Sequence, residues 1–279
     1  MTLLQPGFLA SVPVQNALLI GAGAALLSGA AGVFTVLRGQ SFAGHALADI
    51  SSAGGAMAYL LGISPLLGFF SLSVLGALAL EAVGTRRAAA RDLAAGIVFG
   101  AGMGVTALLL YLDVTVKGTA GAAVAVMFGS LFAAPPGLGI AVALGALAGL
   151  AGLGVIYRPL LLASLDVELA RANGVNTRLL GGAYLLLLAL AVTLSAMAVG
   201  AILSTALLIG PAAAALRLAR NPVAAMALSA LLGLLCAWGG VWLAYQSYGW
   251  TPGHVWPVSF FITALVLVVY AAASLARRR

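Results

Sequence analysis

Charged residues are scarce in this sequence, and their scarcity excludes a soluble globular protein. Asp, Glu, Lys and Arg make up 7% of the 279 residues, whereas hydrophobic residues make up 63%. Soluble domains are about a quarter charged, so this composition leaves too few charges for a wettable surface. The 36 glycines fit a membrane protein, because glycine lets neighbouring transmembrane helices approach closely.

Motifs for covalent chemistry are also missing. The chain contains no G-x-x-x-x-G-K-[ST] phosphate loop, no H-E-x-x-H and no G-x-S-x-G. No soluble segment is long enough for a nucleotide-binding domain, so any ATP that drives this protein is bound by another chain. The lone cysteine, Cys236, excludes a disulfide within the chain. The net charge of +7 does not indicate nucleic-acid binding, because the basic residues stand singly or in short clusters between apolar runs.

Long apolar runs predict an all-α polytopic membrane protein, a bundle of about eight to ten transmembrane helices of about 20 residues each. The candidate spans cover roughly 15–37, 41–62, 64–83, 93–112, 137–157, 179–198, 199–216, 223–245 and 257–275. The region 179–216 could also be divided differently into spans, because Gly200 lies between its two halves. The shorter stretch 119–134 is left open between a half-span, a re-entrant segment and an outer-surface helix. We expect residues 1–279 to form a single transmembrane domain.

Basic residues predict the orientation of these spans. With nine crossings and a cytoplasmic C-terminus, twelve of the thirteen Lys and Arg residues fall inside, and Lys117 falls outside. The twelve are Arg38, Arg86, Arg87, Arg91, Arg158, Arg171, Arg178, Arg217, Arg220, Arg277, Arg278 and Arg279. This bias follows the positive-inside rule.

The longest predicted inner connection, 158–178, carries two of the six acids, Asp166 and Glu168. Its polar and apolar positions predict a short surface helix that ends at Gly174, because glycine suits the left-handed conformation at a helix C-terminus. This segment is too short to be a domain. We expect it to be a docking segment for a soluble partner.

Two titratable residues lie one helical turn apart in the predicted span 41–62. His45 and Asp49 share one helix face, and Ser52 extends the same stripe as a weaker candidate ligand. At a rise of about 1.5 Å per residue, Asp49 lies about 12 Å from the inner end of the span, where a charge should face the bundle interior or a water-filled path. Imidazole and carboxylate groups suit Zn²⁺ or Mn²⁺. The alternative is a His–Asp hydrogen bond that stabilises helix packing and binds nothing.

The sequence resembles, over nearly its whole length, the permease subunits of bacterial ABC importers for divalent metals, the zinc/manganese/iron group. Five segments carry the resemblance in order: SFAGHALADISSAGGAMAYLLG, GIVFGAG, MFGSLFAAPPGLG, DVELARANGVNTRLL and VGAILSTALLIGPAAAALRLAR. The last of them is the closest match to the family pattern. Within it, Pro211 predicts a helix bend that lines the pathway, with a packed kink as the alternative.

Two departures from the family pattern concern the metal. The usual members place the acid first and the histidine four residues later, whereas here His45 precedes Asp49. Near the C-terminus the family often has Asp-x-Pro-x-Gly, whereas this chain reads SYGWTPGHVWP, with Trp250 near the acidic position. His254, just beyond, is a weaker candidate ligand at the outer entrance. The expected substrate is zinc first, with manganese or iron as alternatives.

The resemblance implies a homodimer in the bacterial cytoplasmic (inner) membrane, with the C-terminus inside. It also implies two cytoplasmic ATP-binding subunits docked on 158–178 and an extracytoplasmic protein that delivers the metal. The chain itself would hold no permanent cofactor and catalyse no reaction. One rival is a secondary transporter in which His45 and Asp49 relay protons without an ATPase, which an inverted repeat would favour. The other is a membrane-embedded enzyme, which would need a second ligand cluster or a nucleophile motif.

Overall fold

The computed structural model describes residues 8–83, 88–118, 121–129, 131–135, 137–250 and 256–276. A long helix lies at each of the nine predicted spans, and within the described ranges the regular structure is entirely helical. These helices are α1 Val12–Leu37, α2 Ser41–Leu61, α3 Pro65–Val83, α4 Ala88–Lys117, α6 Leu138–Leu165, α8 Thr177–Val199, α9 Ala201–Leu218, α10 Pro222–Ser247 and α11 Val258–Ala276. Three short helices complete the order: α5 Gly121–Phe128, η1 Leu131–Ala133 and α7 Val167–Ala172.

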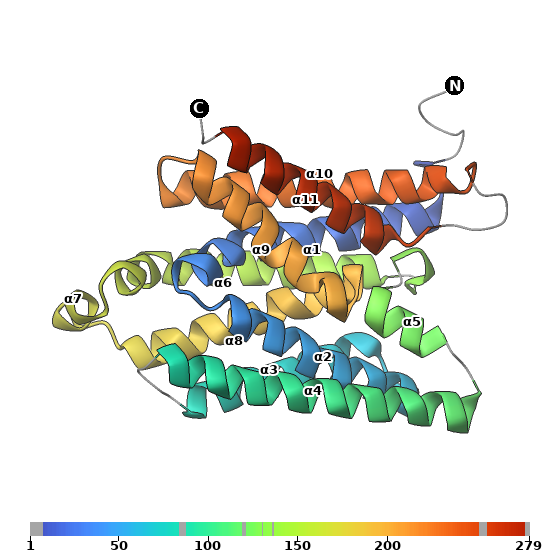
Figure 1. Ribbon diagram of the computed structural model, residues 1–279, viewed down its shortest axis with the longest axis horizontal. Coiled ribbons are helices and arrows are strands. Elements are labelled where there is room, and N and C mark those ends of the chain that lie inside the picture. The colour runs from blue at the N-terminus through green and yellow to red at the C-terminus, as the bar shows by residue number, and fades with distance from the viewer. Residues whose placement is uncertain are drawn as a thin grey trace.

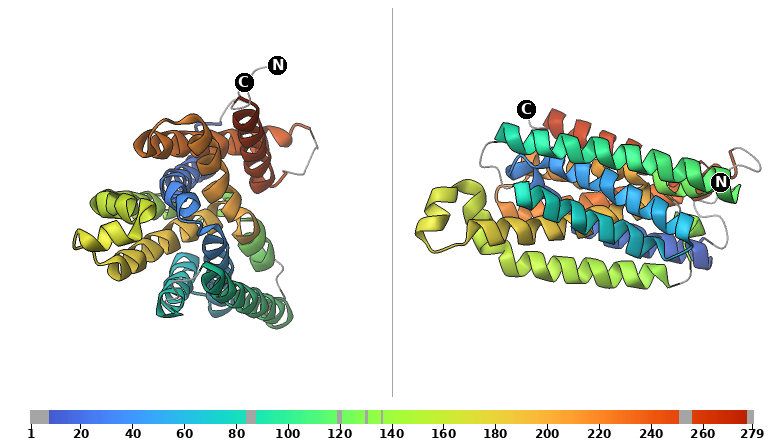
Figure 2. Two further views of the ribbon diagram at one scale, coloured as in Figure 1. Left: turned by 60° about the vertical axis from the view of Figure 1, so that its left-hand side comes forward. Right: turned by 90° about the horizontal axis from the view of Figure 1, so that it is seen from below.

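The long helices run side by side along the longest axis of the molecule (Figure 1). In the end-on view, α1 lies near the centre, with α10 and α11 to one side and α3 and α4 to the other (Figure 2). The central helix α1 packs against α6, α8, α9 and α10. Next to it, α2 packs against α3, α4, α8 and α9. Together with α8, which packs against both, these two helices form the inner part of the bundle.

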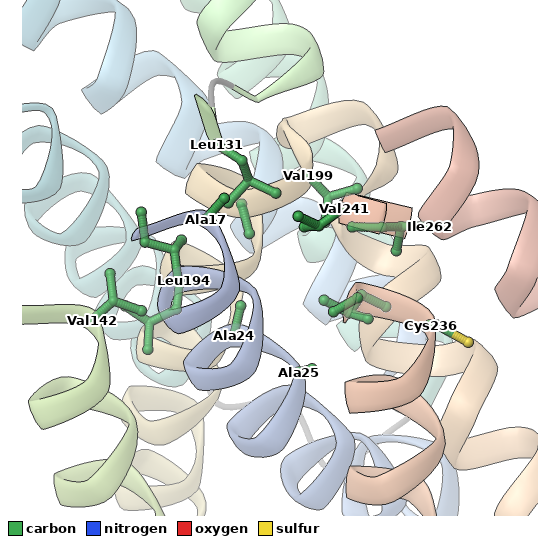
Figure 3. Close-up of a cluster of buried hydrophobic side chains, with 14 of the residues drawn as sticks. Ala17, Ala24, Ala25, Leu131, Val142, Leu194, Val199, Cys236, Val241 and Ile262 are labelled. Carbon is green, nitrogen blue, oxygen red and sulfur yellow. The ribbon is translucent and has the colours of Figure 1, made fainter. Parts of the chain in front are cut away.

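Small side chains make this close packing possible. The core around α1 joins Ala17, Ala24 and Ala25 to Leu194 of α8 and Ile262 of α11 (Figure 3). At Gly29, a side chain would collide with the backbone of Ser229 and Ala230 on α10. Residues without bulk therefore let the α1 and α10 backbones approach, as is typical of membrane helix interfaces.

Eight of the described helices have the length and apolar character to cross a membrane: α1, α3, α4, α6, α8, α9, α10 and α11. The helix α2 is 21 residues long but does not belong to this set, because polar residues interrupt it. The eight spans confirm the predicted all-α polytopic bundle. The helices α3, α4, α8 and α9 pack around α2 and shield its polar residues.

The basic residues gather at one end of the bundle. The α1–α2 turn, α7 and the α9–α10 turn lie together at the left of Figure 1, whereas α1 starts and α4 ends at the opposite end. We call the first the α7 end. Arg38, Arg171, Arg178, Arg217 and Arg220 lie in or beside its connections, and Lys117 ends α4 at the other end. The predicted inner residues Arg86, Arg87 and Arg277 to Arg279 fall outside the described residues.

Several predicted boundaries are wrong, because hydropathy marks the part of a helix inside the bilayer and not its ends. The helix α4 extends beyond 93–112 to Ala88–Lys117. The helix α6 continues through Pro159 to Leu165, so the predicted connection 158–178 includes its last two turns. In the stretch 119–134, α5 has eight residues, or about 12 Å, and is too short to span.

The helices α8 and α9 meet at a single residue, Gly200, where the sequence left their division open. Its φ is +87°, a conformation that only glycine adopts readily. A side chain there would collide with the backbone of Met127 and Gly129 at the end of α5. The corner between α8 and α9 is therefore packed against the short helix α5.

Candidate functional site

Glycine contacts fix the position of α2 between its neighbours. A Cβ atom at Gly102 of α4 would lie 2.7 Å from the Ile50 backbone nitrogen and 2.9 Å from the Asp49 carbonyl carbon. On the α3 side, Gly54 and Gly68 pack directly against each other. The α4 backbone therefore passes α2 at the level of Asp49, which leaves little freedom in the position of its carboxylate.

The structure brings His45 and Asp49 together, as their spacing predicts. His45 Nε2 lies 3.7 Å from Asp49 Oδ2, and the side chains are 33% and 10% exposed. This separation is too long for a hydrogen bond. The His45 ring stacks on Phe99 of α4, with ring centroids 5.1 Å apart. The imidazole therefore stacks on an aromatic ring and lies within ion-pair distance of the carboxylate, without a hydrogen bond to it.

Two buried polar atoms of this pair have no hydrogen-bond partner among the described residues. They are His45 Nδ1 and Asp49 Oδ2. A buried polar atom without a partner costs stability, and most such atoms in proteins are satisfied by a neighbour, water or ion. An imidazole nitrogen and a carboxylate oxygen are the donor atoms that Zn²⁺ and Mn²⁺ use. The pair therefore offers an incomplete cation site.

The Ser52 hydroxyl contacts the backbone of its own helix and a side chain of α4. It donates to the Asp49 carbonyl oxygen at 2.7 Å and lies 2.8 Å from the Thr106 hydroxyl of α4. Thr106 in turn donates to the Gly102 carbonyl oxygen at 2.7 Å. These bonds place Ser52 in the contact between α2 and α4, about one helical turn after Asp49.

No third ligand joins His45 and Asp49 within the part of the chain that the structure describes. Searched over those residues, the protein holds no group of three or more His, Cys, Asp or Glu side chains. His254 falls outside the described residues. Among the described residues, His45 and Asp49 therefore supply only part of a coordination shell.

Pro211 lies inside α9, which stays helical from Ala201 to Leu218. The proline is buried, and its Cγ lies 3.7 Å from where a side chain at Gly233 of α10 would begin. The ring therefore packs at the contact between α9 and α10. A bend at Pro211 that lines a pathway stays a prediction.

The residues of the predicted docking segment form a capped helix. Asp166 caps α7, and its Oδ1 accepts the backbone N–H groups of Glu168 and Leu169, both at 2.9 Å. Gly174 follows the helix with φ +78°, as its position predicts. Apolar side chains are exposed around the helix: Leu165, Val167, Leu169 and Leu179. The helix α7 itself projects beyond the other helices (Figure 1).

Sequence reasoning missed the α4 residues that complete the surroundings of the pair. Phe99 and Gly102 both lie in the run GIVFGAG, which was noted only as a family motif. Thr106 follows Gly102 by one helical turn. Their spacing indicated one face of a helix, but nothing in it indicated that this face meets α2.

Comparisons with known proteins agree with this architecture. The model of the ABC 3 transport family matches residues 12–273. The manganese import system permease protein ScaB of Streptococcus parasanguinis is 30% identical over 84% of this chain and 82% of its own length. The high-affinity zinc uptake system membrane protein ZnuB of Haemophilus influenzae is 29% identical over 82% of this chain and 86% of its own.

Solved structures share the fold. PsaBC from Streptococcus pneumoniae, in complex with a Fab, superposes with a TM-score of 0.81 at 23% identity, over 96% of this chain and 92% of the other. An inward-facing putative metal-chelate type ABC transporter gives a TM-score of 0.75 at 17% identity, over 99% and 91%. Because the family model covers nearly all of the chain, the protein belongs to the ABC 3 transport family.

Proposed function

We propose that this protein is the permease subunit of an ATP-driven importer that moves Mn²⁺ or Zn²⁺ across the cytoplasmic membrane of a bacterium. The observation that carries the proposal is the His45–Asp49 pair, in which His45 Nδ1 and Asp49 Oδ2 are buried and make no hydrogen bond among the described residues. Relatives named for manganese import and for zinc uptake have nearly the same identity to this chain. These similar identities support a divalent transition metal as the substrate. They do not favour manganese over zinc, and they do not support the expectation of zinc first.

His45 and Asp49 act in this proposal as a transit site. A site of two protein ligands holds a cation less firmly than a closed four-ligand site, so the ion can leave again. Water or the second copy of a homodimer supplies the other ligands. The 33% exposure of the His45 side chain leaves the pair accessible to such a ligand.

The α7 segment is proposed as the docking site for two cytoplasmic ATPase subunits, one on each permease copy. Its support is the exposed apolar surface around a capped, protruding helix. Basic residues beside the same end favour a cytoplasmic location under the positive-inside rule. The opposite end then faces outward, where an extracytoplasmic metal-binding protein delivers the ion.

Metal uptake by reconstituted liposomes tests this proposal. The permease and its ATPase partner are placed in vesicles, and ATP-dependent accumulation of Mn²⁺ and Zn²⁺ is measured for the wild type, His45→Ala and Asp49→Ala. Both variants should lose accumulation of the transported ion, because each removes one of two donor groups. Ser195→Ala is the control, because it removes a buried hydroxyl of α8 that contacts Ser28 of α1 and not the pair, and it should retain accumulation. Full metal accumulation by both site variants would contradict the transit site.

A further inference from the structure

A buried pair of hydroxyl groups connects α8 to α1 near the α7 end. Tyr184 of α8 is fully buried, and its hydroxyl lies 2.7 Å from the hydroxyl of Thr35 on α1. Both groups also contact one acceptor, the Ala31 carbonyl oxygen, at 3.0 Å for Tyr184 and 3.1 Å for Thr35. Polar groups inside a membrane bundle are costly unless they are satisfied, so this fully bonded pair fixes α8 against α1.

Arg38 connects the end of α6 to Tyr184. Its guanidinium lies over the Tyr184 ring, 5.5 Å from the centroid, a distance within the range of a cation–π contact. Its Nη1 donates to Ser164 Oγ at 3.5 Å, and Ser164 is the penultimate residue of α6. The docking hairpin consists of the end of α6, α7 and the start of α8. Both of its arms therefore contact α1 through Arg38 and Tyr184.

Thr35 also contacts the start of α2, the helix that bears the proposed cation site. Its carbonyl oxygen accepts the Gln40 backbone N–H at 2.8 Å, which holds the turn from α1 into α2. Its methyl carbon lies 3.8 Å from the position of a Cβ atom at Gly44, the residue before His45. Thr35 thus touches both the first residue before α2 and the turn that carries His45.

We propose that Tyr184, Thr35 and Arg38 form a coupling node that transmits movement of the docking hairpin to the His45 turn of α2. This inference rests on the proposed function, since it assigns the node a role only in an ATP-driven permease. The node is a set of positioning residues, which act on the metal through α2. Coupling between distant sites needs a physical connection with measurable energy, and here the connection is two hydroxyls and one cation.

The pair can be tested by substitutions that remove one oxygen atom each. Tyr184→Phe leaves the Thr35 hydroxyl bonded to the Ala31 carbonyl, and Thr35→Val leaves the Tyr184 hydroxyl bonded to the same oxygen. Neither variant creates an unsatisfied buried donor. A matched control is the Ser28–Ser195 hydroxyl pair, which also joins α1 to α8, at 2.6 Å. In Ser195→Ala, Ser28 keeps the Ala191 carbonyl oxygen as its acceptor.

The measurement is the number of metal ions transported per ATP hydrolysed in liposomes that contain the permease and its ATPase, with Mn²⁺ and Zn²⁺ as probes. We expect this ratio to fall about fivefold or more in Tyr184→Phe and in Thr35→Val, the low end of typical coupling between sites. The double variant should fall no further than Tyr184→Phe alone, because that substitution already removes the hydroxyl contacts with both Thr35 and Ala31. Thr35→Ser, which keeps the hydroxyl, and Ser195→Ala should keep the wild-type ratio.

A second readout separates coupling from damage to the site. Equilibrium binding of Mn²⁺ or Zn²⁺ to the nucleotide-free permease should be unchanged in the node variants. An unchanged transport ratio in Tyr184→Phe and Thr35→Val, or an equal fall in Ser195→Ala, would overturn the inference and leave the proposed function intact. A wild-type complex that accumulates neither metal contradicts the proposed function itself, and the coupling node with it.

Discussion

At the scale of single residues, the separation within the His45–Asp49 pair distinguishes two roles. A pair that served only helix packing would gain most from a direct hydrogen bond, but the two atoms lie 3.7 Å apart. The imidazole is instead positioned by Phe99. Ser52, on the same stripe, has its hydroxyl engaged with Asp49 and Thr106. This geometry is consistent with the metal ligation proposed for the pair, and the Ser52 hydroxyl contributes to the packing of α2 against α4.

Asp49→Asn and Ser52→Ala should separate these two roles. We expect Asp49→Asn to weaken Mn²⁺ or Zn²⁺ binding by about tenfold or more, since even indirect partners of metal ligands contribute that much. Ser52→Ala should leave the affinity unchanged and reduce stability by about 0.6 kcal/mol, the average for a hydrogen bond between membrane helices. Calorimetric titration and thermal unfolding in detergent measure the two effects. A loss of affinity in Ser52→Ala equal to that in Asp49→Asn would make the serine a ligand.

At the scale of helices, the site depends on how closely α4 approaches α2. Gly102 meets the α2 backbone at Asp49 and Ile50, whereas Gly104, two residues later, has no neighbour within 4 Å. These two glycines belong to one helix and differ only in the face on which they lie. They form an internal comparison for the effect of one methyl group.

Gly102→Ala should destabilise the protein by about 1–3 kcal/mol, the usual range for overpacking a tight contact. Gly104→Ala should stay within about 0.5 kcal/mol of the wild type, as is usual for a substitution away from packed contacts. Thermal unfolding of the purified permease in detergent measures both. Equal unfolding temperatures for the two variants would show that α4 does not press on α2 at this level.

The helix α7 offers a second prediction at this scale, because its first turn depends on one side chain. Asp166→Ala removes the oxygen that accepts from Glu168 and Leu169, a loss of about 1 kcal/mol for a helix N-cap. Because the helix has only six residues, loss of its N-cap affects most of it, and we expect weaker retention of the ATPase subunit during co-purification. Asp166→Asn keeps a capping oxygen and should retain the ATPase. If both variants bind the ATPase like the wild type, α7 is not the docking element.

Local sequence signals located the helices well and their partners poorly. Apolar runs marked all nine long helices, and the left-handed Gly174 followed from residue type alone. His45 and Asp49 could be paired because both lie on one helix. The contact of Ser52 with Thr106, 54 residues later in the chain, depends on how α2 and α4 pack together. No local pattern encodes that register, so Thr106, Phe99 and the Tyr184–Thr35 pair could not be found in advance.

At the scale of the whole molecule, the ends of the bundle differ in charge, and that difference predicts its orientation. A membrane-impermeant thiol reagent should label Val116→Cys in intact cells, because Val116 is exposed near the end of α4 away from α7. Glu168→Cys, on α7, should be labelled only after the cells are opened. The wild-type chain is the control, since its one cysteine is buried. The reverse pattern of labelling would contradict the proposed orientation, in which the α7 end faces the cytoplasm.

The polarity of α2 also bears on biogenesis. During synthesis the translocon inserts segments according to their own hydrophobicity, and α2 lies outside the set of described helices that pass that criterion by themselves. Its integration must then be assisted by α1 before it and α3 after it, which pass readily. A nascent chain would hold α2 at the membrane until α3 has emerged. The helix that carries His45 and Asp49 is thus the one whose entry into the bilayer depends on its neighbours.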